Sequence, residues 1–354
     1  MNNKKIVFVG LSGGVDSGTS AAILKERGYG VVGVFIKIWQ PEFIECTWRE
    51  DRLDAIRIAA SLDIPFREID LSHEYKKEVV DSMVSDYERG ITPNPDILCN
   101  EKIKFGVFAQ WAFDHGADLI ATGHYARTAT IDGKTALLRG ADTEKDQSYF
   151  LYRIGERELA RTLFPIGDLC KSQVRERART FGLPVAQKPD SQGLCFVGDV
   201  SMRDFLARYI TLKEGTVLDT KGNKIGTHDG AVLYTIGQRH GFTVNGAEAR
   251  KGIHYVVKLS IEDNTIMVSL DRGAAAVGKA DLSDLHWISE VPRPSLHTHA
   301  QSRYREKPFA ITVHSSDDRF TAVFDEPHLI SPGQSLVLYD GERVLGGGVI
   351  EMSH

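Results

Sequence analysis

The sequence predicts an α/β protein with a doubly wound parallel sheet at the N-terminus, a small β-rich central domain and a C-terminal β-barrel. Three observations predict this architecture. The chain has 354 residues, which is too long for one ordinary hydrophobic core. In the first half, apolar runs of strand length alternate with helical segments. Near residue 200 the pattern changes to short alternating runs broken by glycine.

The N-terminal sheet is predicted from continuous apolar runs, which are typical of strands buried on both faces. These runs cover residues 5–11, 31–36 and 118–123, and a further short strand is predicted at residues 66–70, after Pro65. Helices are predicted at residues 17–27, 49–62 and 104–115, and the first of them ends at Gly28, a residue type that often terminates helices. Such alternation indicates a parallel sheet with helices on both faces.

The second half is predicted to be β-structure. Alternating runs with turn residues between them mark strands at residues 253–259, 265–270, 310–314, 321–324 and 335–339. We therefore expect an α/β domain at residues 1–200, a central β-rich domain at 201–275 and a β-barrel domain at 276–354.

Composition restricts the class of protein. The chain is 42% hydrophobic and 26% charged, which is normal for a soluble globular protein. No apolar run approaches the length of a membrane span, and the N-terminus has neither a signal-peptide nor a transit pattern, so we expect a cytoplasmic protein. The net charge is −5, so any contact with nucleic acid must come from local basic patches.

The cysteines and histidines do not indicate a metal site. The four cysteines form no C-x-x-C pair, and the twelve histidines lack H-x-x-x-H spacing. We therefore expect no bound metal centre. Cys46 and Cys170 are interpreted as packing residues, because buried cysteines are more often structural than reactive.

A glycine-rich turn at residues 12–17 follows the first strand and opens the first helix. Its successive N–H groups and the helix dipole favour a phosphate, and Ser12 and Ser17 add hydroxyl donors. Asp16 could hold Mg²⁺ or cap the turn. The turn has no lysine, so it is not a Walker A loop. The alternative is an ordinary strand-to-helix turn.

Two further cysteines lie in segments rich in proline, aspartate, serine and glycine. Cys99 follows Asp96 by three residues in a segment that we expect to be an irregular loop because it holds Pro93 and Pro95. There the carboxylate could accept a proton as the thiol becomes a thiolate. Cys195 is the second candidate. The alternative for Cys99 is a small buried hydrophobic residue, and the sequence does not show that the two thiols meet.

Two short polar stretches suit contacts with RNA. Residues 145–149 combine a cation, amides and an aromatic ring, and residues 302–307 concentrate positive charge around an aromatic ring. The alternatives are a polar loop for the first stretch and a solvated strand edge for the second. The glycine-containing stretch at residues 233–241 receives no chemical role from its residues.

The phosphate loop resembles the PP-loop of ATP pyrophosphatases, which cleave ATP between its α and β phosphates and adenylate a substrate. Five motifs, in chain order, resemble the bacterial and organellar tRNA-specific 2-thiouridylases over nearly the whole chain. They are GLSGGVDS, TPNPDILCN, ATGHYAR, KDQSYFL and SQGLCF.

The resemblance implies a PP-loop fold related to adenine nucleotide α-hydrolases, and a sulfurtransferase reaction. The C2 oxygen of a wobble uridine in Lys, Glu or Gln tRNA would be adenylated and then replaced by persulfide sulfur, forming 2-thiouridine, AMP and pyrophosphate. Cys99 would be the nucleophile, Cys195 the persulfide carrier and Asp96 the general base, with a transient Cys99–Cys195 disulfide. The chain would act as a monomer and receive sulfur from a cysteine desulfurase or a sulfur-relay protein.

The resemblance also implies the ligand contacts. ATP, accompanied by Mg²⁺, would bind at Gly10, Leu11, Ser12, Gly13, Gly14, Val15, Asp16, Ser17, Ile36 and Gly123. The tRNA and its target base would contact Asn94, Pro95, Asp96, His124, Lys145, Asp146, Gln147, Arg303, Tyr304 and Gln334. The central domain would bind tRNA or act as an adaptor.

Three other functions share some of these features. A different ATP pyrophosphatase, such as a ligase for a small carboxylate or a tRNA lysidine synthetase, would share the loop but need neither Cys99 nor Cys195. An iron–sulfur-dependent tRNA thiolase would normally carry a C-x-x-C motif, although Cys99, Cys195 and Asp96 could in principle hold a cluster. A non-catalytic tRNA-binding protein would have no use for a complete ATP loop.

Overall fold

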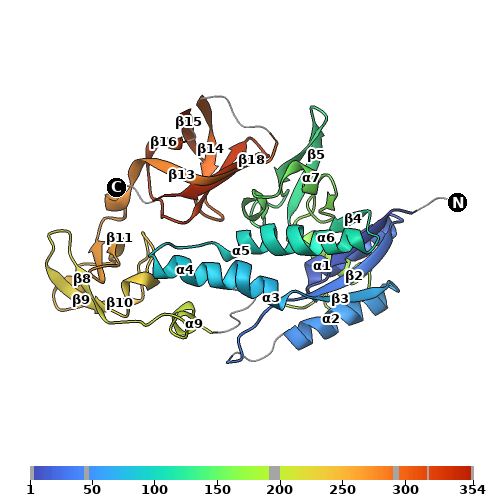
Figure 1. Ribbon diagram of the computed structural model, residues 1–354, viewed down its shortest axis with the longest axis horizontal. Coiled ribbons are helices and arrows are strands. Elements are labelled where there is room, and N and C mark those ends of the chain that lie inside the picture. The colour runs from blue at the N-terminus through green and yellow to red at the C-terminus, as the bar shows by residue number, and fades with distance from the viewer. Residues whose placement is uncertain (1–3, 44–47, 191–199, 290–294, 317–318, 352–354) are drawn as a thin grey trace.

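The structure, a computed structural model, describes residues 4–43, 48–190, 200–289, 295–316 and 319–351. Three sheets make up its framework, and Figure 1 shows them along the chain from the blue N-terminal domain to the red C-terminal barrel. Cys46 and Cys195 lie outside the described residues. Within them, no helix is both long and apolar enough to cross a membrane.

The N-terminal domain contains a five-stranded sheet whose strands are all parallel, in the order β3-β2-β1-β4-β7. The strands are β1 (Ile6–Gly10), β2 (Gly30–Lys37), β3 (Phe66–Asp70), β4 (Leu119–Ala121) and β7 (Thr162–Leu163). Strands β1 to β4 lie where the sequence predicts them.

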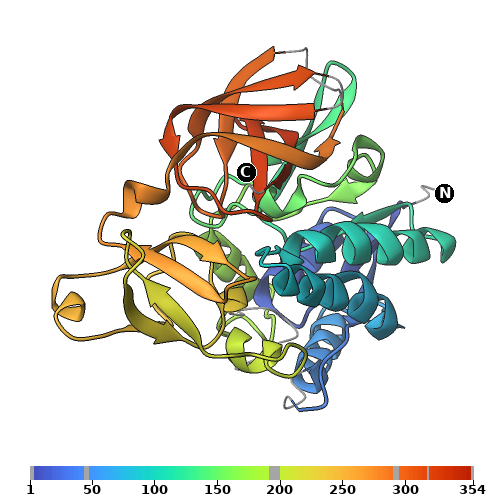
Figure 2. The ribbon, with the colours of Figure 1, turned by 60° about the vertical axis from the view of Figure 1, so that its left-hand side comes forward.

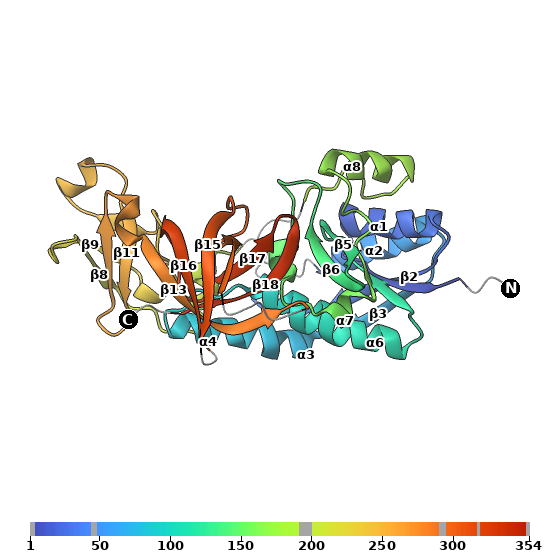
Figure 3. The same cartoon turned by 90° about the horizontal axis from the view of Figure 1, so that it is seen from above.

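Helices cover both faces of this sheet (Figures 1 and 3). Alternate residues of β1 serve different cores, as the two-residue period of a strand requires. Val7 and Val9 pack with one set of helices and Phe8 packs with the other. The first set is α1 (Val15–Glu26), α2 (Trp48–Ser61) and α8 (Lys171–Thr180). The other is α3 (Ser72–Tyr75), η1 (Lys76–Asp81), α4 (Ser82–Glu88), α5 (Pro95–Leu98), η2 (Cys99–Val107) and α6 (Phe108–Asp114).

The central domain is a five-stranded sheet in the order β10-β9-β8-β12-β11. Its strands are β8 (Gly215–Leu218), β9 (Lys224–His228), β10 (Phe242–Val244), β11 (Tyr255–Ser260) and β12 (Thr265–Ser269). All neighbours are antiparallel except β8 and β12. A short helix, α9 (Met202–Leu206), precedes this sheet.

The C-terminal domain is a closed barrel of six strands, because β13 pairs with both β16 and β18. The strands are β13 (Val277–Trp287), β14 (Ser295–Gln301), β15 (Phe309–Ser316), β16 (Arg319–His328), β17 (Ser335–Asp340) and β18 (Arg343–Ile350). Closure removes the open edges that a flat sheet would present. The fold class predicted from the sequence is therefore confirmed.

A hairpin from the N-terminal half extends the barrel sheet. Strands β5 (Ala126–Ile131) and β6 (Lys134–Arg139) form this hairpin, and β6 pairs antiparallel with β18. Figure 2 shows the green hairpin beside the orange and red strands. A short helix, α7 (Glu156–Leu159), packs near β6. The hairpin fixes the barrel against the domain that holds the phosphate loop. The predicted domain borders remain predictions.

Candidate active site

The phosphate loop joins β1 to α1 and needs glycine at one position. Gly13 has φ +74°, and a Cβ atom there would lie 2.2 Å from the backbone oxygen of Asp51. The Ser12 N–H donates to Ser17 Oγ at 3.2 Å, and the Ser17 hydroxyl donates to the Gly14 carbonyl at 3.3 Å. The loop therefore turns tightly at the N-terminus of α1, where backbone N–H groups favour an anion.

Two other residues expected at the nucleotide stand next to this loop. A Cβ atom at Gly123, which directly follows Thr122 at the end of β4, would lie 2.7 Å from Ser17 N. The strand end thus packs directly on the start of α1. A Cβ atom at Gly10 would lie 3.8 Å from Ile36 Cδ1. The structure therefore brings Gly10, Ile36 and Gly123 to one edge of the sheet with residues 12–17.

Lysines from distant segments stand beside the loop. Lys171, the first residue of α8, donates to both carboxylate oxygens of Asp16 at 2.8 Å. Lys188 donates to the Gly13 carbonyl at 3.2 Å and to Asp51 Oδ1 at 2.8 Å. Sequence reasoning missed both lysines. They could not be predicted because they lie far from the loop in the sequence, and residues so distant share no local sequence pattern.

Asp190 joins three cations. Its carboxylate pairs with Lys145 at 2.8 Å, Lys171 at 2.8 Å and Arg175 at 2.7 Å. Burial raises the pKa of Asp190, but the hydrogen bonds from Lys145 and Lys171 outweigh it and lower the pKa to about 2. Lys171 therefore bridges two carboxylates, Asp16 in the phosphate loop and Asp190, which stands five positions before Cys195 in the sequence.

The segment that holds Asp96 and Cys99 is helical, so the expectation of an irregular loop at these residues is wrong. Asn94 is the N-cap and Pro95 is the first residue of α5, where proline is tolerated because no helical partner exists for its missing N–H. Asp96 and Cys99 are three residues apart on this helix and so lie on one side of it. Cys99 is buried.

The helix continues from Cys99 as a π-helix, η2, which brings a lysine into the site. Lys104 Nζ donates to Asn100 Oδ1 at 3.0 Å and lies 3.5 Å from His124 Nε2. Burial raises the pKa of Asp96, and the charge of Lys104 opposes this rise. A carboxylate with a raised pKa is suited to accept a proton near neutral pH.

His124 is a buried, neutral imidazole. Burial and the charge of Lys104 hold its pKa well below 6.5. Lys104 can only donate, so we assign the acceptor role to His124 Nε2 and the proton to Nδ1, which lies 2.8 Å from Thr122 Oγ1. Residues 122–124 thus contact the start of α1 through Gly123 and the Cys99 helix through His124.

The three candidate tRNA contacts at residues 145–147 stabilise the loop in which they lie through hydrogen bonds and an ion pair. The Lys145 ammonium pairs with Asp190. Asp146 accepts from the N–H groups of Gly140 and Ser148 at 2.9 Å and 3.0 Å. Gln147 Oε1 accepts from the Tyr125 N–H at 3.0 Å. Their bonds within the chain place this loop beside the residues that follow His124.

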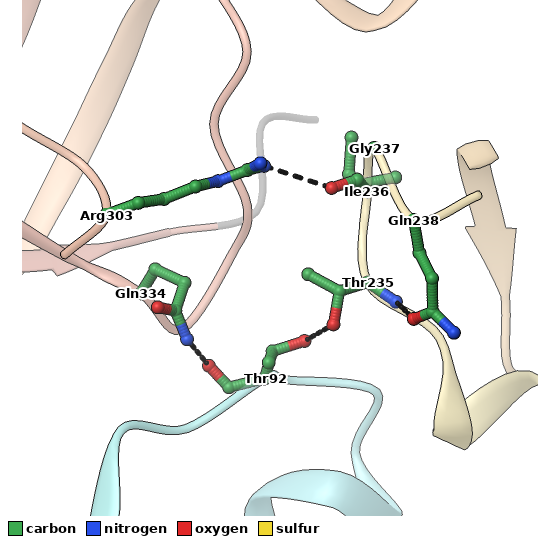
Figure 4. A pocket seen from close by; sticks show the side chains of 7 residues that line it. All are labelled: Thr92, Thr235, Ile236, Gly237, Gln238, Arg303 and Gln334. Atoms are coloured by element: carbon green, nitrogen blue, oxygen red, sulfur yellow. Dashed lines mark hydrogen bonds between the residues drawn. The ribbon is translucent and has the colours of Figure 1, made fainter. Parts of the chain in front are cut away.

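The C-terminal candidates lie at a junction of the three domains. Arg303 and Gln334 line a pocket of about 360 Å³ together with Thr92 and residues 235–238 (Figure 4). Burial lowers the pKa of Arg303. Tyr304 lies apart from the pocket lining and packs against Phe150, with 4.5 Å between ring centroids.

The described residues thus form two groups. The residues expected to bind the nucleotide surround the phosphate loop. Asp96, Cys99 and His124 are linked to this loop by residues 122–124, which contact both the start of α1 and the helix that continues from Cys99. Arg303 and Gln334 lie at the junction just before Asn94. The contact between Cys99 and Cys195 stays a prediction, because Cys195 lies outside the described residues.

Three family models match consecutive parts of the chain. The "tRNA methyl transferase HUP domain" matches residues 5–199, the "tRNA methyl transferase PRC-barrel domain" matches residues 203–270, and the "Aminomethyltransferase beta-barrel domain" matches residues 277–350. Together they cover the three sheets described above.

Curated relatives match almost the full length. The tRNA-specific 2-thiouridylase MnmA of Salmonella typhimurium is 42% identical over 356 residues, covering 98% of this chain and 97% of that protein. The protein of the same name from Citrobacter koseri is 43% identical with the same coverage. A solved 4-thiouridine synthetase–RNA complex with ATP is 20% identical, covers 58% of this chain and 50% of that chain, and has a TM-score of 0.35, too low to support an inference.

Proposed function

We propose that this chain, which belongs to the tRNA-specific 2-thiouridylase family and is a tRNA-uridine 2-sulfurtransferase, works through an adenylated uridine and a cysteine persulfide. One observation carries the proposal. Residues 122–124 touch both halves of the site, with Gly123 against Ser17 and His124 beside Lys104 of the Cys99 helix. A nucleotide on the loop and a base near Cys99 would therefore be neighbours.

The first step is adenylation. The N–H groups of residues 12–17 and the hydroxyls of Ser12 and Ser17 hold the phosphates of ATP. The uridine O2 attacks the α-phosphorus, and pyrophosphate leaves. Lys171 and Lys188 stand beside the loop and offset the negative charge of the pyrophosphate. In proteins with a Walker A loop, a lysine within the loop itself has this role.

Mg²⁺ fits this site as an ion bound mainly by ATP. Protein-bound Mg²⁺ commonly uses one or two carboxylates together with substrate phosphates, and Asp16 supplies one carboxylate at the loop. When bound, the ion would neutralise phosphate charge. Asp16 also accepts from the Tyr125 hydroxyl at 2.8 Å, which orients the carboxylate.

The second step inserts sulfur. Asp96 accepts the proton of Cys99, and the Cys99 thiolate attacks the Cys195 sulfur of the Cys195 persulfide. The S–S bond of the persulfide breaks, hydrosulfide leaves, and a Cys99–Cys195 disulfide forms. Hydrosulfide then attacks C2 of the uridine and AMP leaves. A cellular thiol reductant supplies the two electrons that restore both cysteines.

A second route for sulfur insertion gives the same products, 2-thiouridine, AMP and a Cys99–Cys195 disulfide. The terminal sulfur of the persulfide attacks C2 directly and AMP leaves. The Cys99 thiolate then attacks the Cys195 sulfur, and 2-thiouridine leaves as the same disulfide forms. Both routes need two cysteines near one carbon atom.

The partners follow from this chemistry. The proposed substrate is the wobble uridine of Lys, Glu and Gln tRNAs, held by Asn94, Pro95, Asp96, His124, Lys145, Asp146, Gln147, Arg303, Tyr304 and Gln334. The persulfide requires a sulfur donor, which we propose to be a cysteine desulfurase or a sulfur-relay protein. We also propose that the chain acts as a monomer.

Mass spectrometry of tRNA nucleosides tests the proposal. Purified chain is incubated with tRNA, ATP and a persulfide donor, and the expected products are 2-thiouridine, AMP and pyrophosphate. Omission of ATP should remove all three. Thiolation without ATP, or ATP cleavage to ADP and phosphate, would contradict the adenylation step.

A further inference from the structure

The stretch at residues 233–241, to which the sequence assigns no role, forms one wall of the pocket between the three domains. Residues 235–238 face Thr92 of the N-terminal domain and Arg303 and Gln334 of the barrel (Figure 4). Thr92 precedes Asn94, the N-cap of the helix that carries Asp96 and Cys99. The junction therefore lies at the entry to the catalytic helix.

The barrel binds the backbone of the residues that precede α5. The Gln334 side-chain amide donates to the Thr92 carbonyl at 2.7 Å and to the Pro93 carbonyl at 3.3 Å. The Thr92 N–H donates to the Pro332 carbonyl at 3.3 Å. The two segments approach so closely that a Cβ atom at Gly333 would lie 2.1 Å from Ile91 Cγ2.

The central domain completes the junction. The Thr235 and Thr92 hydroxyls are 2.9 Å apart and share a hydrogen bond. Arg303 donates to the Ile236 carbonyl at 3.0 Å and to Ser331 Oγ at 3.2 Å. Arg303 thus ties residues 235–238 to the barrel loop that carries Gln334.

The hydrogen bonds from the barrel to Thr92 and Pro93 stabilise a segment that can form few backbone hydrogen bonds of its own. Pro93 has no N–H group, and neither does Pro95 at the first position of α5, so Asn94 supplies the only backbone N–H in residues 93–95. Carbonyl groups in such a segment need partners from elsewhere, and Gln334 supplies them. A shift at residues 92–93 passes directly into the start of α5, because a helix moves as a rigid unit.

We propose that Gln334 is a positioning residue of the reaction: it fixes the backbone at Thr92 and Pro93 and so sets where Asp96 and Cys99 stand. Thr235 and Ile236 of the central domain and Arg303 of the barrel hold the same junction. This inference rests on the proposed function of Asp96 and Cys99. It differs from the role that the resemblance implies for Gln334, which is contact with tRNA, because both bonds of the Gln334 amide run to the backbone of this chain.

Gln334→Leu separates the two roles. The variant removes both hydrogen bonds and keeps a side chain of similar size. Hydrogen exchange of residues 91–100, measured by mass spectrometry on the full chain without RNA or ATP, should become at least about fivefold faster, because the loss of even one hydrogen bond of ordinary net strength has that effect. This readout does not depend on the thiolation chemistry, so it stands even if the proposed function fails.

Single-turnover thiolation at saturating tRNA supplies the second readout. Because misplacement by about 1 Å can cost up to roughly 100-fold in rate, we expect a loss of about 10- to 100-fold that excess tRNA does not restore. Unchanged exchange at residues 91–100, or a normal rate once tRNA saturates, would overturn the proposal and leave Gln334 as an RNA contact only.

Two further variants control the experiment. Gln238 lines the same pocket but bonds within its own turn, to Thr235 N at 3.2 Å and to the His240 carbonyl at 2.9 Å. Gln238→Leu should leave exchange at residues 91–100 unchanged, and an increase equal to that of Gln334→Leu would overturn the proposal. If Gln334→Leu does not fold by circular dichroism, Thr235→Val tests the junction from the central side, with a smaller increase in exchange expected and no increase counting against it.

Discussion

The phosphate loop and the three-domain junction are built in opposite ways. The loop spans residues 12–17 between one strand and one helix. Its neighbours Ile36 and Gly123 lie in β2 and just after β4, the two strands that flank β1 in the sheet. The junction joins Thr92, residues 235–238 and Gln334 from three domains, across as many as 242 positions. One region is local in sequence and the other is assembled by the tertiary fold.

The difference indicates how the two chemical steps are separated. In the proposed mechanism, adenylation relies on backbone N–H groups whose position follows from the strand–loop–helix unit itself. Sulfur insertion would rely on Asp96 and Cys99, whose helix begins at the junction. Changes near the loop should therefore affect ATP chemistry, while changes at the junction or its helix should affect the use of the activated base.

The largest effect should separate the two steps completely. Cys99→Ser and Cys195→Ser should each lower thiolation by about 1,000-fold or more, because each removes an atom of the reaction. Pyrophosphate release and tRNA binding should continue. Nucleoside mass spectrometry and a pyrophosphate assay measure both steps. Thiolation retained in either variant would refute the two-cysteine mechanism.

A change beside the phosphate loop should have the next largest effect. Lys171→Met should slow adenylation by about 100- to 1,000-fold, as expected when a preorganised charge near the phosphates is lost, and Lys171→Arg should retain part of the rate. The measurement is pyrophosphate release under single-turnover conditions. Arg177→Met on the same helix, where Arg177 contacts Glu26 at the surface, is the matched control and should be unaffected. Equal losses in both variants would indicate a role in folding.

A smaller effect should appear as a shift in pH dependence. Burial raises the pKa of Asp96 and the charge of Lys104 lowers it. In Lys104→Met that opposing charge is lost, so the pKa of Asp96 rises and more of the carboxyl is protonated at acidic pH. The acidic limb of the thiolation profile should move to higher pH, whereas Lys104→Arg should keep it. A lower rate with an unmoved limb would show that Lys104 only maintains structure.

The smallest expected effect of a single substitution is on the salt dependence of the affinity for tRNA. The affinity for tRNA should fall steeply with salt, with a log–log slope of about 0.7 to 0.9 for each phosphate contact. Arg303→Met should reduce the slope by roughly one contact, as measured by fluorescence anisotropy. ATP binding through backbone N–H groups should depend less on salt. An affinity for tRNA that is independent of salt would contradict binding through local basic residues.

The sequence predicted the parts of the molecule in which a pattern is local. Continuous apolar runs predicted β1, β2 and β4, a short run after Pro65 predicted β3, and the glycine-rich turn predicted the phosphate loop between β1 and α1. The irregular loop expected around Asp96 was wrong because two prolines received more weight than the helix-start signal of Asn94 followed by Pro95.

The contacts that link distant segments could not be predicted. Lys171 lies 155 positions from Asp16, and no spacing rule joins residues so far apart. The β5–β6 hairpin was also missed as a strand pair, and its partner β18 lies near the end of the chain. Such contacts depend on how complete sheets pack together, and a single sequence carries no record of that packing.

The pairing of β6 with β18 has a consequence for synthesis of the protein. Residues 137 and 138 leave the ribosome more than 200 positions before their partners Val344 and Arg343. Until then the β6 edge presents unpaired backbone groups, which are a template for pairing with another chain. A chain that stops before β18 would keep that edge open. Strand β18, which is made more than 200 positions later, therefore protects the edge of β6 from aggregation.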